Sequence, residues 1–275
     1  MPNSEMPSAG PLMKGKRGLV MGVANNHSIA WGAARMLAAQ GAELAFTYQG
    51  EAFGKRVQPL AESVGSSLVM PCDVEDIGTV DAVFDTLGKE WGGIDFVVHA
   101  IAYSDKNELK GKYADTTRDN FIRTMVISCF SFTEIAKRAA ALMNDGGSLV
   151  TLTYGGATRV MPNYNVMGVA KAALESSVRY LASDYGASGI RVNAISAGPM
   201  RTLAGAGIAD ARAMFSFQRQ HSPLRRPVTL DEVGGAALYL LSDLSGGVTG
   251  EVHFVDAGYN IISTPRPEDM NGGEN

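Results

Sequence analysis

Short apolar runs alternate with longer amphipathic segments along most of the chain. The runs are apolar at successive positions instead of at every second one, which is typical of strands covered on both faces of a sheet. They occupy residues 17–24, 42–48, 67–74, 94–102, 147–154, 190–198 and 251–258. Segments with helical spacing lie between them, for example at 28–41, 117–143 and 164–186.

This alternation predicts an α/β fold with a doubly wound parallel sheet of the Rossmann type. No internal repeat or linker divides the chain, so we expect a single domain over residues 15–262. An N-terminal extension is expected at 1–14, and a flexible tail rich in proline, glycine and acidic residues at 263–275. The segment 203–220 combines glycines with apolar helical spacing, which suits either a mobile lid or an ordinary packed helix.

Composition narrows the class of protein. The chain of 275 residues is 45% hydrophobic and 19% charged, as globular proteins are, and its net charge of −4 argues against nucleic acid and membranes as partners. It contains no run long enough to span a bilayer and no secretion signal. Cys72 and Cys129 lack metal-ligand spacing, and the histidines form no metal cluster. We therefore expect a cytoplasmic protein that binds no metal.

Ligands of such sheets bind at the carboxyl ends of the strands. After the first run, "GVANNHSIAWG" supplies small residues that let the backbone approach a pyrophosphate at a helix N-terminus, although the usual G-x-G-x-x-G is absent. Gly22 and Ser28 are candidates for this contact. The Ser28 hydroxyl either caps the following helix or binds a phosphate, and the sequence leaves both open.

The ends of the next two runs bear on the choice of cofactor. Gln49 stands where many NAD sites carry an acid for the ribose 2′-hydroxyl, with Glu51 close by and no cation before Lys55. A 2′-phosphate would meet no neutralising charge next to Gln49, so NADH is favoured over NADPH. Asp73 either accepts a bond from the adenine amino group or is an ordinary loop aspartate.

Together these segments resemble the short-chain dehydrogenase/reductase family, most specifically in "VRYLASDYGASGIRVNAISAGPMRT". Ordinary members carry Tyr-x3-Lys, with a serine well before the tyrosine. If Lys171 is the lysine, those two positions hold Met167 and Tyr154 instead. Tyr164 lies one turn earlier on the same predicted helix and, at roughly 3.6 residues per turn, on nearly the same face as Lys171. We therefore predict that Tyr164 and Lys171 form a reactive pair.

The spacing Tyr-x6-Lys in "YNVMGVAK", with "SIAWG", "HAIAY" and "AISAGPMRTLA", is similar to the bacterial enoyl-acyl-carrier-protein reductases. The resemblance implies an NADH-dependent, homotetrameric enzyme that reduces the trans-2 double bond of enoyl thioesters on acyl carrier protein, in fatty acid elongation. It implies the catalytic residues Tyr154, Tyr164 and Lys171. The expected cofactor-binding residues are Gly22, Ser28, Ile29, Gln49, Asp73, Val74, Ile101, Lys171, Met200 and Thr202, and the expected substrate-binding residues are Ala102, Tyr154, Tyr164 and Met214.

The hypothesis for the chemistry is transfer of hydride from NADH to Cβ, with negative charge developing on the thioester oxygen. Tyr164 would donate a hydrogen bond to this enolate, and Lys171 would hold the nicotinamide ribose and place positive charge nearby. Core packing explains Ile101 equally well, and Thr202 suits a phosphate or the carboxamide. In a lid, Met214 and Phe215 would line the acyl chain.

Two other functions compete with this one. A carbonyl or alcohol-forming reductase of the same superfamily would need Tyr-x3-Lys, which Met167 interrupts. A non-catalytic dinucleotide-binding protein would have no need of Tyr164 and Lys171 together.

Overall fold

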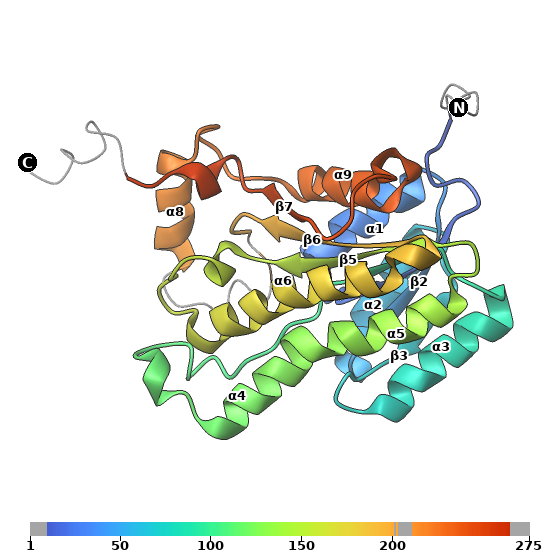
Figure 1. Cartoon of the computed structure of the whole chain (residues 1–275), viewed down its shortest axis with the longest axis horizontal. Coiled ribbons are helices and arrows are strands. Elements are labelled where there is room, and N and C mark those ends of the chain that lie inside the picture. Colours follow the sequence, from blue (N-terminus) through green and yellow to red (C-terminus); the bar gives the residue numbers. More distant parts are fainter. Residues whose placement is uncertain (1–9, 201, 203–210, 265–275) are drawn as a thin grey trace, which may run out of the picture.

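The computed structural model describes residues 10–200, 202 and 211–264, with the backbone alone at 211–214. Its centre is a parallel sheet of seven strands in the order β3-β2-β1-β4-β5-β6-β7 (Figure 1). This confirms the predicted doubly wound α/β fold. The strands are β1 (Arg17–Met21), β2 (Glu43–Tyr48), β3 (Leu68–Pro71), β4 (Phe96–His99), β5 (Gly147–Thr153), β6 (Ile190–Ala197) and β7 (Val252–Val255).

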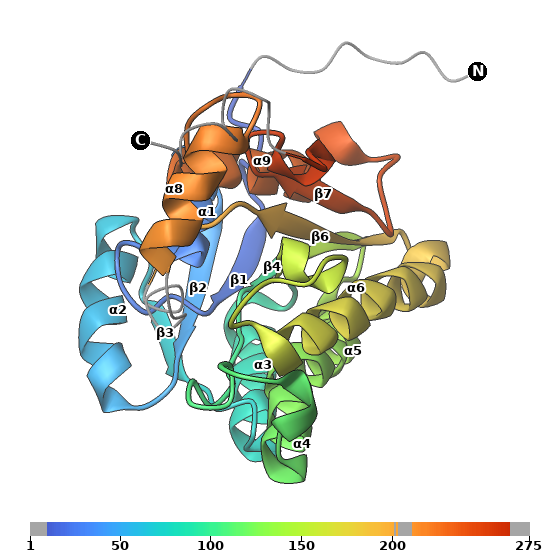
Figure 2. The same ribbon diagram turned by 90° about the vertical axis from the view of Figure 1, so that its left-hand side faces the viewer.

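Helices cover both faces of the sheet (Figure 2). One face packs against α1 (Ile29–Ala39), α2 (Glu51–Ser63) and α9 (Leu230–Leu241). The other packs against α3 (Ile77–Trp91), α5 (Ser131–Leu142) and α6 (Asn165–Tyr185), with α4 (Arg118–Met125) beside α6. Helix α8 (Ala211–His221) lies near the carboxyl end of β7, where Gln218 donates a 3.2 Å hydrogen bond to the carbonyl of Asp256. The described 3-10 turns are η1 (Tyr113–Asp115), η3 (Gly155–Ala157), η4 (Gly186–Ser188), η5 (Asp243–Ser245) and η6 (Tyr259–Ile261).

The continuous apolar runs are explained by two cores, one on each face. In β1, the successive residues Leu19, Val20 and Met21 are all fully buried. Leu19 and Met21 belong to the core under α3, α5 and α6, whereas Val20 belongs to the core under α1, α2 and α9. Alternate side chains of a strand point to opposite faces, so a strand between two cores has to be apolar throughout.

Glycines bring α1 and α9 into close contact. A Cβ on Gly234 would lie 2.6 Å from the carbonyl oxygen of Gly32, and a Cβ on Gly32 would lie 2.7 Å from that of Leu230. Both distances are shorter than a van der Waals contact. The two helix backbones can therefore meet only because these positions have no side chain.

The topology opens a crevice between β1 and β4. The chain proceeds from β1 through β2 to β3 at one edge, and β4 then returns to the other side of β1. Ligands of open α/β sheets bind at such a switch point. Gly22, directly after β1, has φ +94°, and a Cβ there would lie 2.1 Å from the carbonyl oxygen of Ala100 after β4. Glycine keeps the two strand ends close at this crevice.

The predicted helical stretch 117–143 contains an interruption that the sequence pattern did not indicate. Between α4 and α5 the chain forms a π-helical turn, η2 (Val126–Phe130). Ser128 of this turn accepts a 2.9 Å hydrogen bond from the backbone N–H of Tyr103 and donates a 3.0 Å bond to its carbonyl. The turn thereby fixes the loop that follows β4.

The predicted end segments are partly described. Met13, in the expected extension 1–14, is fully buried against the core that includes α1, so the described end of this segment packs on the domain. Residues 203–210 of the expected lid and 265–275 of the expected tail lie outside the described residues. Within the described part of the chain, no helix has both the length and the apolar character required to cross a bilayer.

Candidate active site

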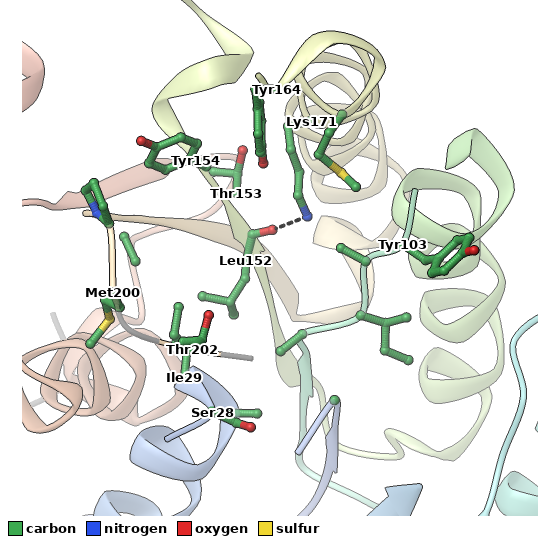
Figure 3. A pocket seen from close by; sticks show the side chains of 18 of the residues that line it. Ser28, Ile29, Tyr103, Leu152, Thr153, Tyr154, Tyr164, Lys171, Met200 and Thr202 are labelled. Carbon is green, nitrogen blue, oxygen red and sulfur yellow. Dashed lines mark hydrogen bonds between the residues drawn. The ribbon is translucent and has the colours of Figure 1, made fainter. Parts of the chain in front are cut away.

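A cavity of about 520 Å³ lies at the carboxyl ends of the strands, between β1, β4, β5 and β6 (Figure 3). It brings together predicted site residues from segments far apart in the sequence. Those that line it are Gly22, Ser28, Ile29, Ile101, Ala102, Tyr154, Tyr164, Lys171, Met200 and Thr202. Phe215 of α8 lines it too.

Tyr164 occupies the N-cap position of α6 and is only 8% exposed. Its neighbours Asn163 and Asn165 have φ of 57° and 30°, in the left-handed region that asparagine tolerates better than most residues. The Asn165 side-chain amide also lies 3.3 Å from the carbonyl oxygen of Glu108. This local backbone directs the Tyr164 hydroxyl into the cavity, into which the Lys171 side chain also points (Figure 3).

Lys171 lies on the cavity side of α6 and is 5% exposed. Its Nζ donates a 2.7 Å hydrogen bond to the backbone carbonyl of Leu152 in β5. Burial lowers the pKa of Lys171 to about 8, although Cys129 and Glu175 act in the opposite direction. The ammonium group is therefore held in place but titrates closer to neutrality than an exposed lysine does.

Tyr154 meets Tyr164 edge to face, with ring centroids 5.2 Å apart and the planes at 70°. The Tyr154 hydroxyl is directed away from Tyr164 and Lys171 (Figure 3). Burial raises the pKa of Tyr154 to about 12, with smaller contributions from Tyr259 and Asp256. Burial also raises the pKa of Tyr164. Both phenols are consequently neutral hydrogen-bond donors across the physiological range.

Ser28 begins α1 without capping it through its side chain. Its hydroxyl oxygen instead accepts hydrogen bonds of 3.0 Å and 3.2 Å from the backbone N–H groups of Ala24 and Asn25. The alternative in which the Ser28 hydroxyl caps α1 is thus wrong. The hydroxyl proton takes part in neither of these bonds, and Ser28 lines the cavity.

Gln49, Asp73 and Val74 do not line the cavity. Gln49 and Asp73, after β2 and β3, are joined by a 2.9 Å hydrogen bond from the Gln49 amide to the Asp73 carboxylate. Val74 is 6% exposed and packs in the core, so its side chain is largely committed to packing. Met214 belongs to α8, but its side chain lies outside the described part of the structure.

Several lining residues were absent from the sequence-based assignment. Leu109 and Met167 pack with Tyr164 in a small apolar cluster on the cavity wall, and Lys106 lies at the same wall. Leu109 belongs to a loop without regular spacing, so no pattern indicates it. Glu175 is a buried carboxylate behind the cavity. Its position four residues after Lys171 could have indicated, from the sequence, that the two side chains are neighbours on one helix face.

Side chains that commonly bind metals do not cluster among the described residues. These residues contain no group of three or more histidine, cysteine, aspartate or glutamate side chains that could hold a metal ion. Cys72 and Cys129 are both free and buried.

Comparison with known proteins identifies the family. The sequence model of the family described as "Enoyl-(Acyl carrier protein) reductase" matches residues 22–260. The chain belongs to the enoyl-acyl-carrier-protein reductase family. A curated member of this family, enoyl-[acyl-carrier-protein] reductase [NADH] 2 of Rhizobium meliloti (strain 1021), is 76% identical over 257 residues, 94% of this chain and 96% of that protein.

Solved structures of family members share the fold. The enoyl-acyl-carrier-protein reductase of Anaplasma phagocytophilum, in complex with NAD, is 59% identical with a TM-score of 0.91 over 94% of this chain and 98% of that one. The Bacillus cereus enoyl-acyl carrier protein reductase, with NADP+ and indole naphthyridinone, is 50% identical with a TM-score of 0.91 over 92% and 99%. The reductase family resemblance in the sequence is therefore confirmed.

Proposed function

We propose that this protein reduces the trans-2 double bond of enoyl thioesters carried by acyl carrier protein, with NADH, in fatty acid elongation. The observation that carries the proposal is the placement of Tyr164 and Lys171 in one cavity at the switch point of the sheet. Family membership supports it, because the curated relative from Rhizobium meliloti is named as an NADH-dependent enzyme of this kind.

The residues around the crevice fit a dinucleotide. Gly22 and Ser28 line the cavity where α1 begins, as a pyrophosphate site requires, and Ser28 retains a hydroxyl proton for a phosphate oxygen. Ile29, Ile101, Met200 and Thr202 line the same cavity, where they would contact the cofactor. When bound, NADH supplies the hydride that adds to Cβ of the enoyl group.

Tyr164 is proposed to donate a hydrogen bond to the thioester oxygen as negative charge develops there. A donor held in place in a water-poor site stabilises such charge by roughly 3–4 kcal/mol. The raised pKa of Tyr164, caused first by burial, keeps the phenol protonated for this task. Lys171 is proposed to hold the nicotinamide ribose hydroxyls and to add positive charge near the thioester oxygen.

The part of the cavity lined by Ala102 and Tyr154 is proposed to receive the acyl thioester. Ala102 leaves space near the start of the loop after β4, and Tyr154 packs edge to face with Tyr164. Because the Tyr154 hydroxyl is directed away from Lys171, its proposed role is to shape the pocket and support the Tyr164 ring. Met214 is proposed as a further contact of the acyl chain.

A preference for NADH over NADPH is proposed from the ends of β2 and β3. The Gln49 amide N–H₂ group donates to Asp73, which leaves the Gln49 carbonyl oxygen able to accept a bond from a ribose hydroxyl. Asp73 and Glu51 would repel a 2′-phosphate. Asp73 and the backbone of Val74 are proposed to contact the adenine.

We also propose a homotetramer in the cytoplasm. Large apolar side chains are exposed on the outer side of the helical layer formed by α4, η2 and α6, namely Phe121, Ile122, Phe130 and Tyr180. Exposed apolar groups on neighbouring helices are typical of surfaces that are covered in an oligomer. Light scattering after size-exclusion chromatography tests this, and any mass other than that of a tetramer would contradict it.

A rate assay tests the proposed reaction. NADH absorbance is followed with a crotonyl thioester and, separately, with a 3-ketoacyl thioester. We expect oxidation of NADH with the first and little with the second. Preference for the ketone would instead indicate a carbonyl reductase, and no oxidation with either thioester would indicate a binding protein.

A further inference from the structure

Glu175 is a buried carboxylate that the proposed chemistry does not use. It lies one turn after Lys171 on α6 and is 8% exposed. Thr153, the last residue of β5, donates a 2.7 Å hydrogen bond from its Oγ1 to Oε1 of Glu175, and Thr153 itself lines the cavity. An ionised carboxylate is costly to bury, so its presence here calls for a partner charge.

The same strand end holds the charged groups of Lys171 and Glu175. Leu152 accepts the hydrogen bond of Lys171, and the next residue, Thr153, donates to Glu175. These two contacts fix the ammonium and the carboxylate to neighbouring residues of β5. The separation between the two charges is therefore set by backbone rather than by flexible side chains.

The other groups that face Lys171 are neutral near neutral pH. Cys129 of η2 is a thiol, because burial raises its pKa. His99 of β4 is a neutral imidazole, because burial first and Lys171 second lower its pKa to about 3. Tyr164 is a neutral phenol, because burial raises its pKa. Cys129 raises the pKa of Lys171 only as a thiolate, so among these described neighbours Glu175 is the one that can offset the charge of Lys171 near neutral pH.

Glu175 has the partners that an anion needs. Burial raises its pKa, but the Thr153 hydroxyl, Arg179 one turn further along α6, and Lys171 all lower it. Opposite charges one turn apart on a helix attract each other, and the order of Glu175 followed by Arg179 is the more favourable of the two orders. We infer from this that the carboxylate is ionised in the working pH range.

We propose that Glu175 is a positioning residue that keeps Lys171 protonated, and that Thr153 holds the carboxylate in the place this requires. The inference builds on the proposed function because it concerns the same lysine. An opposite charge at about 4–6 Å changes a pKa by roughly one to three units. Without the Glu175 charge, burial would lower the pKa of Lys171 further.

The test measures the titration of Lys171 in the ligand-free protein. Lysine labelled with ¹³C at Cε is followed by NMR across the neutral and alkaline range, and the Lys171 signal is the one missing from a Lys171→Met variant. Glu175→Gln keeps the side-chain size and an acceptor for Thr153 but removes the charge. We expect its Lys171 midpoint to fall by about one unit or more relative to wild type.

The control variant is Asp184→Asn, which removes an exposed charge from the same helix and should leave the Lys171 midpoint in place. An unchanged midpoint in Glu175→Gln, or an equal fall in Asp184→Asn, would overturn the proposal. If Glu175→Gln does not fold, Thr153→Val replaces it. Thr153→Val removes the hydrogen bond that holds the Glu175 carboxylate. The Lys171 midpoint should then fall by less than in Glu175→Gln, and an unchanged midpoint counts against the proposal.

The outcome is independent of turnover. If the expected NMR shift is seen but enoyl thioesters are not reduced, the proposed function is wrong and the role of Glu175 stands. If enoyl thioesters are reduced but the Lys171 midpoint does not shift, the proposed function stands and the role of Glu175 is wrong.

Discussion

The ammonium group of Lys171 donates a 2.7 Å hydrogen bond to the backbone carbonyl of Leu152. This bond ties α6 to the carboxyl end of β5, and it fixes the ammonium group in the cavity that the Tyr164 hydroxyl also enters (Figure 3). Donors that are already in place before charge develops need no reorganisation during the reaction. The predictions below follow from this arrangement and from the packing around it.

Activity should fall as the pH rises through about 8, the value to which burial lowers the pKa of Lys171. Below this pH the lysine carries the positive charge assigned to it, and above it the charge is lost. The measurement is kcat for a crotonyl thioester against pH. Lys171→Met should give a low rate that does not change across this range. A wild-type rate that stays constant well above pH 8 contradicts the role of Lys171.

Gly156→Ala should lower kcat by roughly ten- to a hundredfold, because a small displacement of a catalytic group has effects of this size. A Cβ on Gly156 would lie 2.4 Å from Cδ1 of the Tyr164 ring and would push the ring aside. Gly155→Ala is the matched control, since a Cβ there meets only the flexible end of Met161, at 3.4 Å. Steady-state kinetics of both variants decide this, and equal rates would refute it.

Two adjacent glycines of α9 should respond oppositely to alanine. Gly234→Ala forces a Cβ to 2.6 Å from the carbonyl of Gly32 and should destabilise the protein by about 1–3 kcal/mol. Gly235→Ala meets open space within a helix and should stabilise it by up to about 1 kcal/mol. Urea unfolding monitored by circular dichroism gives both values. Similar stability of the two variants would show that α1 and α9 do not pack as described.

Gln49→Arg should shift the cofactor preference toward NADPH by about tenfold or more in the ratio of kcat/KM values, because a guanidinium pairs well with a phosphate. Gln58→Arg adds the same charge on an exposed part of α2 and is expected to leave the ratio unchanged. Initial rates with each cofactor give the ratios. An unaltered ratio in Gln49→Arg would place the adenosine ribose elsewhere.

The sequence predicts the sheet well because each apolar run serves two cores. The run around Val20 has no polar alternation, and this feature identifies a strand covered on both sides without any knowledge of its partners. The π-helical turn that holds Ser128 against Tyr103 has no comparable signal, because hydrophobic spacing does not distinguish one extra residue in a helical turn.

The site was only partly predictable, because spacing along the chain reveals contacts within one helix but not contacts between elements. Tyr164 and Lys171 could be paired because the period of one helix relates them. The direction of Tyr164 depends on two asparagines with positive φ, and the fixing of Lys171 depends on a carbonyl of another element. Such contacts arise from tertiary packing, which the spacing along the chain does not encode.

The most direct test of the account is the turnover of Tyr164→Phe, which removes the phenolic hydroxyl and keeps the ring. We expect kcat for a crotonyl thioester to fall by roughly 10²–10³-fold, while the dissociation constant of NADH, measured by fluorescence, stays at the wild-type value. Tyr185→Phe, at the end of the same helix and outside the cavity, should match wild type in both. Wild-type kcat in Tyr164→Phe would contradict the assignment of Tyr164 as the donor to the enolate.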